Sequence, residues 1–252
     1  MSLRSKLWRG AKSALGLRHL YELAAAPYVH GAVTDILNRA RYGAAAPRFA
    51  ERLWIDPRTV QRFDRKGTVW RSARVVTGAW PRGDEQPMEQ DPILQTSIAH
   101  WVEGKSWEDS GEVARMEATI SKYPGIAGCF TRDDILQRCA RLDGIFRVIE
   151  REHRVRSMTE LDPGNYREFG GIGMHIGPNG ELIRAGHGRH RFAMALILGI
   201  ELIPVRVGMV HRSALPVLAG LRQQPTGPAV PPYRRHDRNS DTVALAPGPR
   251  IT

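Results

Sequence analysis

One short segment limits the possible folds of this chain more than any other. Residues 186–191 read Gly-His-Gly-Arg-His-Arg and run directly into the apolar residues 192–200. Glycines let a backbone turn sharply and approach a ligand closely. The first N–H groups of a helix have no partner within the helix, and the helix dipole adds partial positive charge at that end. The segment therefore predicts a turn that opens a helix and binds an anion.

Arginine strengthens this prediction, because a guanidinium group forms forked hydrogen bonds with phosphate oxygens. We expect backbone donors, the positive helix end and two guanidinium groups to converge on one phosphate. The predicted phosphate-binding residues are Gly186, His187, Gly188, Arg189, His190 and Arg191.

The charge of the chain points in the same general direction. Its 37 lysines and arginines exceed its 26 acidic residues and give a formal net charge of +11. Such an excess indicates a polyanionic neighbour, either nucleic acid or an anionic membrane surface, although an arginine-rich surface without such a partner has the same composition. An apolar fraction of 42% and a charged fraction of 25% are typical of a soluble globular protein.

Cysteine content bears on the compartment. Cys129 and Cys139 are the two cysteines, and their spacing fits neither a metal site nor a disulfide framework. No run of residues approaches the roughly 18 apolar residues of a transmembrane helix. These features predict a cytoplasmic protein.

The pattern along the chain divides it into four regions. The predicted regions are a basic helical N-terminal region (1–48), an extended arm followed by helices (49–159), a core of strands and helices (160–222) and a disordered tail (223–252). Within the first region, residues 2–24 have the pattern of a basic amphipathic helix. That helix would lie on an anionic membrane, on nucleic acid, or against its own domain.

Local signals place the elements of the middle region. Apolar runs and turn residues predict strands around 53–55 and 75–76, and a proline-rich loop over 81–92. A helix over 93–121 is expected to break near Gly104 and to start again with Ser106 as its cap. Thr131, followed by two acids, predicts the start of a helix that runs to about 152.

The region from 170 onward alternates strands and helices. Asn179-Gly180 is a strong hairpin signal between predicted strands at 172–176 and 181–185. The turn at 186–191 follows, then a helix to about 198 that Gly199 ends. A strand at 203–207 and a helix at 213–222 complete the region. This order predicts an α+β fold with a small mixed sheet.

Residues 171–210 resemble the ParB/sulfiredoxin superfamily. The resemblance rests on the Asn-Gly hairpin, on the Gly-x-Gly-Arg-His-Arg turn that opens a helix, and on Leu-Gly-Ile-Glu-Leu-Ile-Pro-Val at 198–205. Residues 74–80 and 104–108 also resemble segments of ParB-like prokaryotic proteins. The resemblance implies a nucleotide phosphate held at the turn, and hence a nucleoside triphosphate with Mg²⁺ as the cofactor.

Two departures from the family pattern limit the chemistry that this resemblance implies. Sulfiredoxins carry a catalytic cysteine where this chain has Arg189, so repair of peroxiredoxins is not expected. Kinase-like and nuclease-like members carry an acid where this chain has Ala185. The remaining catalytic candidates are the carboxylates of Glu168 and Glu181 and the imidazole of His190.

Three functions follow from these observations. The first is a ParB-like protein that binds a nucleotide or another phosphate at the turn. The second is a nucleic-acid-binding or nuclease-like module that uses the same turn, and the third is a small-molecule kinase or NTP hydrolase. No metal site is predicted, because His175, His187, His190 and His211 lack the spacing of metal ligands.

Overall fold

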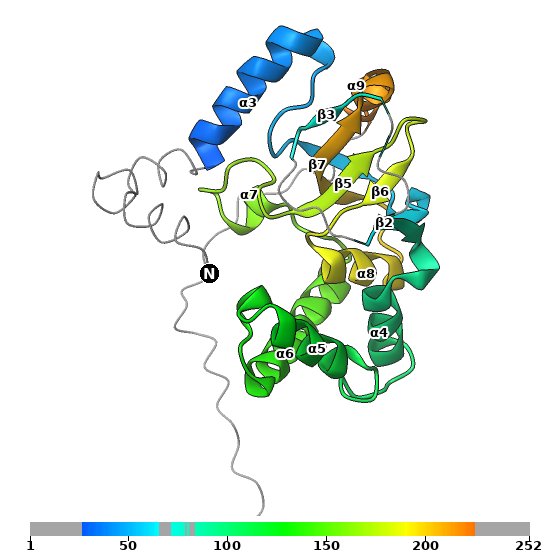
Figure 1. Ribbon diagram of the computed structural model, residues 1–252. Helices are drawn as coiled ribbons and strands as arrows, with labels where there is room; N and C mark the ends of the chain where they lie inside the picture. The colour runs from blue at the N-terminus through cyan, green and yellow to red at the C-terminus, as the bar shows by residue number, and fades with distance from the viewer. Residues whose placement is uncertain (1–26, 66–71, 79, 81–83, 225–252) are drawn as a thin grey trace, which may run out of the picture.

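The computed structural model describes residues 27–65, 72–78, 80 and 84–224 (Figure 1). It has an α+β fold, as predicted, built on one mixed sheet with the strand order β1-β7-β5-β6-β2-β4, in which β3 also pairs with β7. The strands are β1 (Arg52–Ile55), β2 (Arg62–Asp64), β3 (Val75–Val76), β4 (Glu85–Pro87), β5 (Ile172–Ile176), β6 (Leu182–Arg184) and β7 (Ile203–His211).

The centre of the sheet is the predicted hairpin and the strand that follows it. β5 and β6 pair antiparallel, and Gly180 at their turn has a φ of 82°, a conformation that suits glycine. The chain then passes through α8 (Arg189–Ile197) and returns as β7, which pairs parallel with β5. β7 is four residues longer than predicted, because its end also pairs with β3.

Residues 52–87 belong to the same sheet. β1 pairs antiparallel with β7, and β2 pairs parallel with β6 and antiparallel with β4. The boundary expected at residue 160 therefore does not divide the sheet, because residues before it supply four of its strands. The prediction of a loop over 81–92 was wrong in part, since β4 lies within it and pairs with β2. The pairings of β1 with β7 and of β2 with β6 join residues more than 100 positions apart, so no local pattern could have indicated them.

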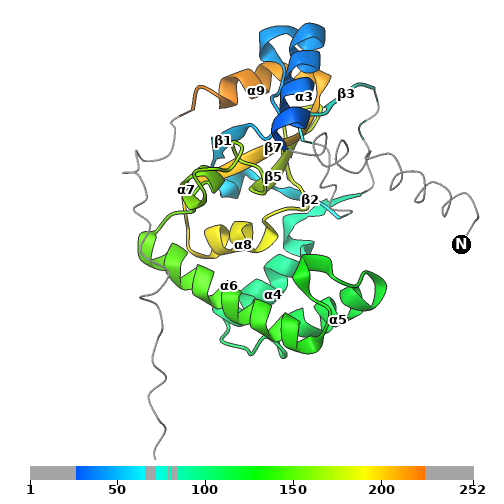
Figure 2. The same ribbon diagram turned by 90° about the vertical axis from the view of Figure 1, so that its left-hand side faces the viewer.

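Helices cover the sheet in layers. They are α3 (Pro27–Tyr42), α4 (Pro92–Trp101), α5 (Glu112–Lys122), α6 (Arg132–Glu152), α7 (Met158–Leu161), α8 and α9 (Leu215–Leu221). In Figure 2, α8 lies directly below the sheet and α4, α5 and α6 lie below α8, whereas α3 and α9 lie above the sheet. We call α4, α5 and α6 the helical layer. Apolar side chains of β5, β7, α8 and the helical layer form one core.

The starts of the helices test the capping predictions. Thr131 caps α6 as expected, since its hydroxyl accepts a hydrogen bond from the Asp134 N–H at 3.2 Å and the Asp134 carboxylate accepts one from the Thr131 N–H at 2.9 Å. The prediction for Ser106 was wrong. Its hydroxyl accepts from the Asp109 N–H within a turn, and α5 begins only at Glu112. The predicted helix over 2–24 and all but the first two residues of the predicted tail (223–252) lie outside the described residues.

A buried ion pair joins the sheet to the helical layer. Arg184 of β6 donates to Asp91 with a distance of 2.7 Å between Nη2 and Oδ2, and both side chains are almost fully buried. Asp91 also caps α4 through the Ile93 N–H. Burial lowers the pKa of Arg184 to about 10, although the charge of Asp91 acts to raise it.

We predict that Asp91→Asn lowers the free energy of unfolding by about 3–5 kcal/mol, because it leaves Arg184 as an uncompensated buried charge. Urea unfolding at pH 7 measures the change. Asp91→Asn combined with Arg184→Met should recover most of the loss. Asp56→Asn is the matched control, since the Asp56–Arg58 pair is exposed and should contribute little. Equal effects of the two asparagine variants would contradict the prediction.

Candidate phosphate-binding site

Two glycines, Gly188 in the turn and Gly173 in β5, let the turn at 186–191 pass close to the start of β5. Gly188 precedes α8 in the left-handed conformation, with a φ of 68°, and a Cβ atom there would lie 2.7 Å from Cα of Ile172. The Gly173 N–H donates to the His187 carbonyl at 3.1 Å. A Cβ atom on Gly173 would in turn contact Ala185 at 3.0 Å. The turn is therefore a fixed part of the sheet rather than a loose loop.

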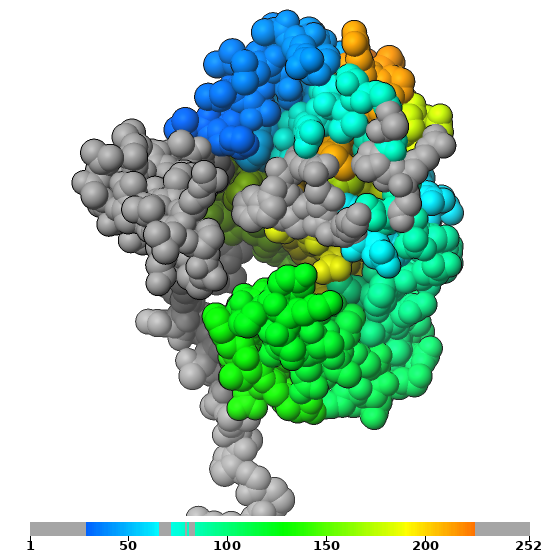
Figure 3. All heavy atoms as spheres, in the orientation of Figure 1, coloured from blue at the N-terminus to red at the C-terminus, as the bar shows by residue number. Residues whose placement is uncertain are grey.

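No side chain of the described residues caps the N-terminus of α8. Gly188 at the cap position supplies none, and the first N–H groups of a helix have no partner within it. Figure 3 shows the yellow atoms of the segment around α8 in a recess between the green helical layer and the sheet. The first N–H groups of an uncapped helix end are suited to bind an anion.

Arg189 lies on the side of the turn that faces the helical layer. Among the described residues its guanidinium group has neither a hydrogen bond nor an ion pair. Burial lowers its pKa, and the charge of Arg115 on α5 lowers it further, while Asp91 and Glu112 act in the opposite direction. An incompletely paired guanidinium group at a helix N-terminus is suited to bind an anion.

Arg191 and Arg206 lie on the side that faces the sheet. Arg191 donates from Nη2 to the Gly170 carbonyl at 2.9 Å and from Nη1 to the Met158 sulfur at 3.2 Å, so part of its role is structural. Arg206 projects from the middle of β7 and is buried. Burial lowers the pKa of both groups.

Glu168 is the acidic side chain whose charge acts on both of these arginines. It is 1% exposed, and its two oxygens accept from the Met158 N–H at 3.1 and 3.2 Å. Burial raises the pKa of Glu168 to about 7, although the Met158 N–H and the charges of Arg52 and Arg191 lower it. The predicted candidate Glu168 therefore lies beside the turn and titrates near neutral pH.

His187 is a neutral member of the same group. Burial lowers its pKa to about 4, and the charges of Arg206, Arg191 and Arg189 lower it further. A neutral imidazole retains one N–H and can donate it to a phosphate oxygen without adding a charge.

The side chain of His190 points from the turn toward α5 and α6, contrary to the phosphate contact that the sequence suggested. Its Nε2 lies 3.2 Å from Oε1 of Glu112, and its Nδ1 lies 3.4 Å from Nη2 of Arg138. Since arginine can only donate, Nδ1 accepts and the Nε2–H group donates to Glu112. Burial lowers the pKa of His190, which agrees with this neutral form. Both of its nitrogens are occupied, so we assign it a positioning role instead of phosphate contact or proton transfer.

The other predicted candidates lie elsewhere. Glu181 accepts from the Asn179 N–H at 2.8 Å within its own hairpin turn. His175 is buried on the sheet and accepts from the Met209 N–H at 2.9 Å. His211 lies at the far end of β7 and contacts the Gly78 carbonyl. In the described part of the chain no three metal-ligating side chains lie together.

Sequence reasoning missed the contribution of the helical layer. Arg115 and Arg138 both act on Arg189 by charge, and Nε of Arg138 is buried without a hydrogen-bond partner among the described residues. Arg115 comes from α5 and Arg138 from α6, 71 and 48 residues before the start of the turn. Only the tertiary packing of α6 against α8 indicates this group.

Comparison of the chain with protein-family models, with curated proteins and with solved structures finds no match. None of the helices in residues 27–65 and 84–224 is long and apolar enough to cross a membrane.

The pKa of Glu168 gives a prediction about stability. A carboxyl group whose pKa rises from 4.5 to about 7 on folding stabilises the protein below pH 4.5, and this contribution is lost as the pH rises through 7. The loss is at most about 3 kcal/mol. We therefore expect the stability of the wild type relative to Glu168→Gln to fall between pH 4.5 and 7.5.

Urea unfolding of both proteins across this range tests the prediction. The comparison removes the contribution of His187, whose lowered pKa acts with the opposite sign and reduces stability as the pH falls from 6.5 through 4. Glu181→Gln, which removes a carboxyl group that lies in its own hairpin turn, is the matched control. A difference that stays constant with pH for Glu168→Gln would show that this carboxyl group has an ordinary pKa.

Proposed function

We propose that this protein binds a phosphate-bearing small molecule, with a nucleotide as the first candidate, at the turn formed by residues 186–191. One observation carries the proposal. Arg189 and Arg191 lie in the first turn of α8, and the charge of Arg206 acts on His187 in the same turn. The guanidinium group of Arg189 forms no hydrogen bond or ion pair with the described residues, so its donors are left for a ligand.

A phosphate group would complete this arrangement. Its oxygens can accept from the first N–H groups of α8 and from the forked donors of Arg189. Its negative charge would raise the lowered pKa values of the arginines and favour the protonated form of Glu168. The bound ligand and a proton on Glu168 would therefore stabilise each other.

The resemblance to the ParB/sulfiredoxin superfamily supports a nucleotide over free phosphate. In this proposal a nucleoside triphosphate enters with Mg²⁺ as its own counterion, because the described residues offer no cluster of acidic ligands for the ion. We further propose that the protein acts in the cytoplasm. The support is that Cys129 and Cys139 are both unpaired thiols.

Isothermal titration with ATP, CTP, GTP and inorganic phosphate, with and without Mg²⁺, tests the proposal. Arg189→Met is the informative variant, since Arg189, unlike Arg191, forms no hydrogen bond with the described residues that the substitution would remove. We expect it to weaken binding about tenfold or more, the contribution typical of a hydrogen bond to a charged group. Arg147→Met, at an exposed position on α6, is the matched control and should bind as the wild type does.

Two results would contradict this function. One is the absence of binding by all four ligands, and the other is equal affinity of wild type and Arg189→Met. Binding of DNA instead, with an affinity that falls steeply with salt and depends on Arg189, would favour the nucleic-acid-binding alternative. Cleavage of DNA that survives Arg189→Met and Arg191→Ala would place a nuclease site elsewhere.

Glu168 favours phosphoryl transfer as a second candidate function. A carboxyl group with a pKa of about 7 is suited to donate a proton once a bound phosphate favours its protonated form, and Glu168 interacts with two arginines of the site. Glu168 would take the role of the acid that kinase-like and nuclease-like members carry at the position of Ala185.

Release of labelled phosphate from ATP in the presence of Mg²⁺ tests this role. We expect Glu168→Gln to lower the rate at least about a hundredfold, the contribution typical of a positioned acid or base, while Glu181→Gln keeps the wild-type rate. Nucleotide binding without any phosphate release would leave the protein as a binding module.

A further inference from the structure

The helix α3 is attached to the body of the protein by its polar face. Asp35 accepts from the Phe49 N–H at 2.6 Å and forms an ion pair with Arg167 at 2.7 Å. Asn38 donates to the carbonyls of Pro47 and Ala73 at 2.9 and 2.8 Å. These contacts fix which side of α3 faces the protein.

The opposite face of α3 is apolar and exposed. Val29, Val33, Ile36 and Leu37 are 48%, 51%, 68% and 63% exposed. Their spacing of four, three and one residues places them on one side of a helix, about 180° from the inward side. Surface helices usually place this stripe against the core. The inverted arrangement in α3 leaves an apolar stripe without a partner among the described residues.

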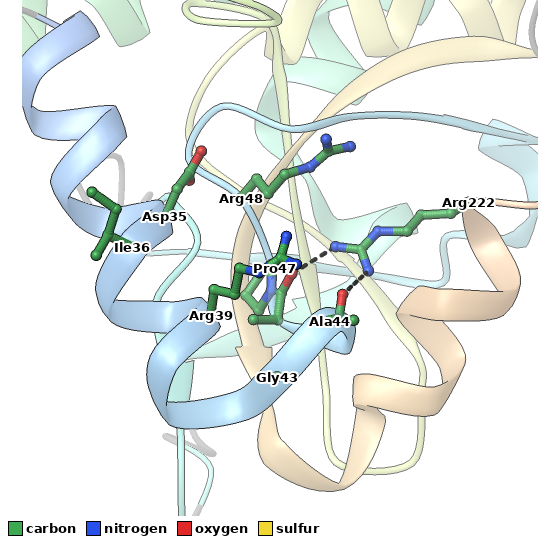
Figure 4. A pocket seen from close by; sticks show the side chains of 9 residues that line it. Asp35, Ile36, Arg39, Gly43, Ala44, Pro47, Arg48 and Arg222 are labelled. Atoms are coloured by element: carbon green, nitrogen blue, oxygen red, sulfur yellow. Dashed lines mark hydrogen bonds between the residues drawn. The ribbon is translucent and has the colours of Figure 1, made fainter.

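Cations flank this stripe on both sides. At 100° per residue, Arg39 and Arg41 fall on opposite borders of the stripe, and both are exposed. A hollow of about 460 Å³ opens beside Arg39, where Arg48 and Arg222 also contribute (Figure 4). A second hollow of about 370 Å³ opens on the other side and is lined by Arg41 and Arg74.

The cations differ in how far they are already paired. Arg222 is bound to Glu51 and to the Ala46 carbonyl. Arg48 is 60% exposed and lies 3.5 Å from Glu51, and Arg39 forms no hydrogen bond or ion pair with the described residues. Arg39 and Arg48 therefore remain available to an external anion at the rim of the apolar stripe.

We propose that the exposed face of α3 binds an anionic phospholipid membrane surface. The apolar stripe would enter the boundary between headgroups and acyl chains, and the flanking arginines would contact lipid phosphates from above. Charge complementarity selects this occupant, because a chain of net charge +11 repels a second copy of itself but is attracted to an anionic surface. The proposal is independent of the ligand at residues 186–191.

Co-sedimentation of the full-length chain with vesicles tests this surface. The probes are vesicles of phosphatidylglycerol mixed with phosphatidylcholine and vesicles of phosphatidylcholine alone. We expect binding to the anionic vesicles only, weakened by salt. Ile36→Glu combined with Leu37→Glu should weaken it roughly tenfold or more, because two apolar side chains no longer enter the bilayer.

Controls separate this effect from others. Val102→Glu, a substitution at another apolar residue that is 62% exposed, should leave vesicle binding unchanged. Ile36→Ser combined with Leu37→Ser should also weaken binding, which shows that the added charges are not the cause, and thermal unfolding should confirm that each variant is folded. Arg39→Gln combined with Arg48→Gln should reduce the preference for anionic vesicles.

Three outcomes would overturn the proposal. Wild-type vesicle binding by the Ile36/Leu37 variants would show that other residues, such as 2–24, carry the membrane contact. Equal binding to vesicles of phosphatidylcholine alone would remove the role of the arginines. A dimer in sedimentation velocity that the Ile36/Leu37 variants dissociate would identify the occupant as a second copy of the chain.

Discussion

The hydrogen bond between His190 and Glu112 holds the candidate site together. Glu112, the first residue of α5, is 1% exposed and accepts from His190, from Arg115 and from the Thr96 hydroxyl on α4. Burial alone would raise the pKa of Glu112, but the donors from His190 and Arg115 outweigh it and lower the pKa to about 2. One ionised carboxylate thus joins α4, α5 and α8.

This bond explains why the turn is surrounded by cations from several elements. It fixes the helical layer against the N-terminus of α8, and in doing so it brings Arg115 and Arg138 close to Arg189. The contrast with Arg184 is informative. Arg184 is fully buried and has Asp91 as a dedicated partner, whereas the guanidinium group of the partly buried Arg189 has none among the described residues. The unused donors of Arg189 are the basis of the proposed phosphate contact.

Local signals in the sequence predicted the parts of the fold that depend on neighbouring residues. The Asn179-Gly180 hairpin, the Thr131 cap and the Gly188–α8 turn all depend on residues within a few positions of one another. The sheet membership of residues 52–87 could not be predicted in this way, because strand pairing is set by distant partners. The same limit applies to His190. Its position in a basic turn suggested a ligand contact, but Glu112, 78 residues away, determines its direction.

The orientation of α3 is a further feature that local sequence signals do not predict. The sequence shows an amphipathic pattern but not which side faces inward, and here the inward side is decided by Asp35 and Asn38. In Figure 2, α3 lies above the sheet and α8 below it. A membrane held against α3 would therefore lie on the far side of the sheet from the turn at 186–191. Because the two surfaces do not overlap, the protein could occupy both at once, and a ligand at the turn would remain in exchange with solution while the protein is bound to the membrane.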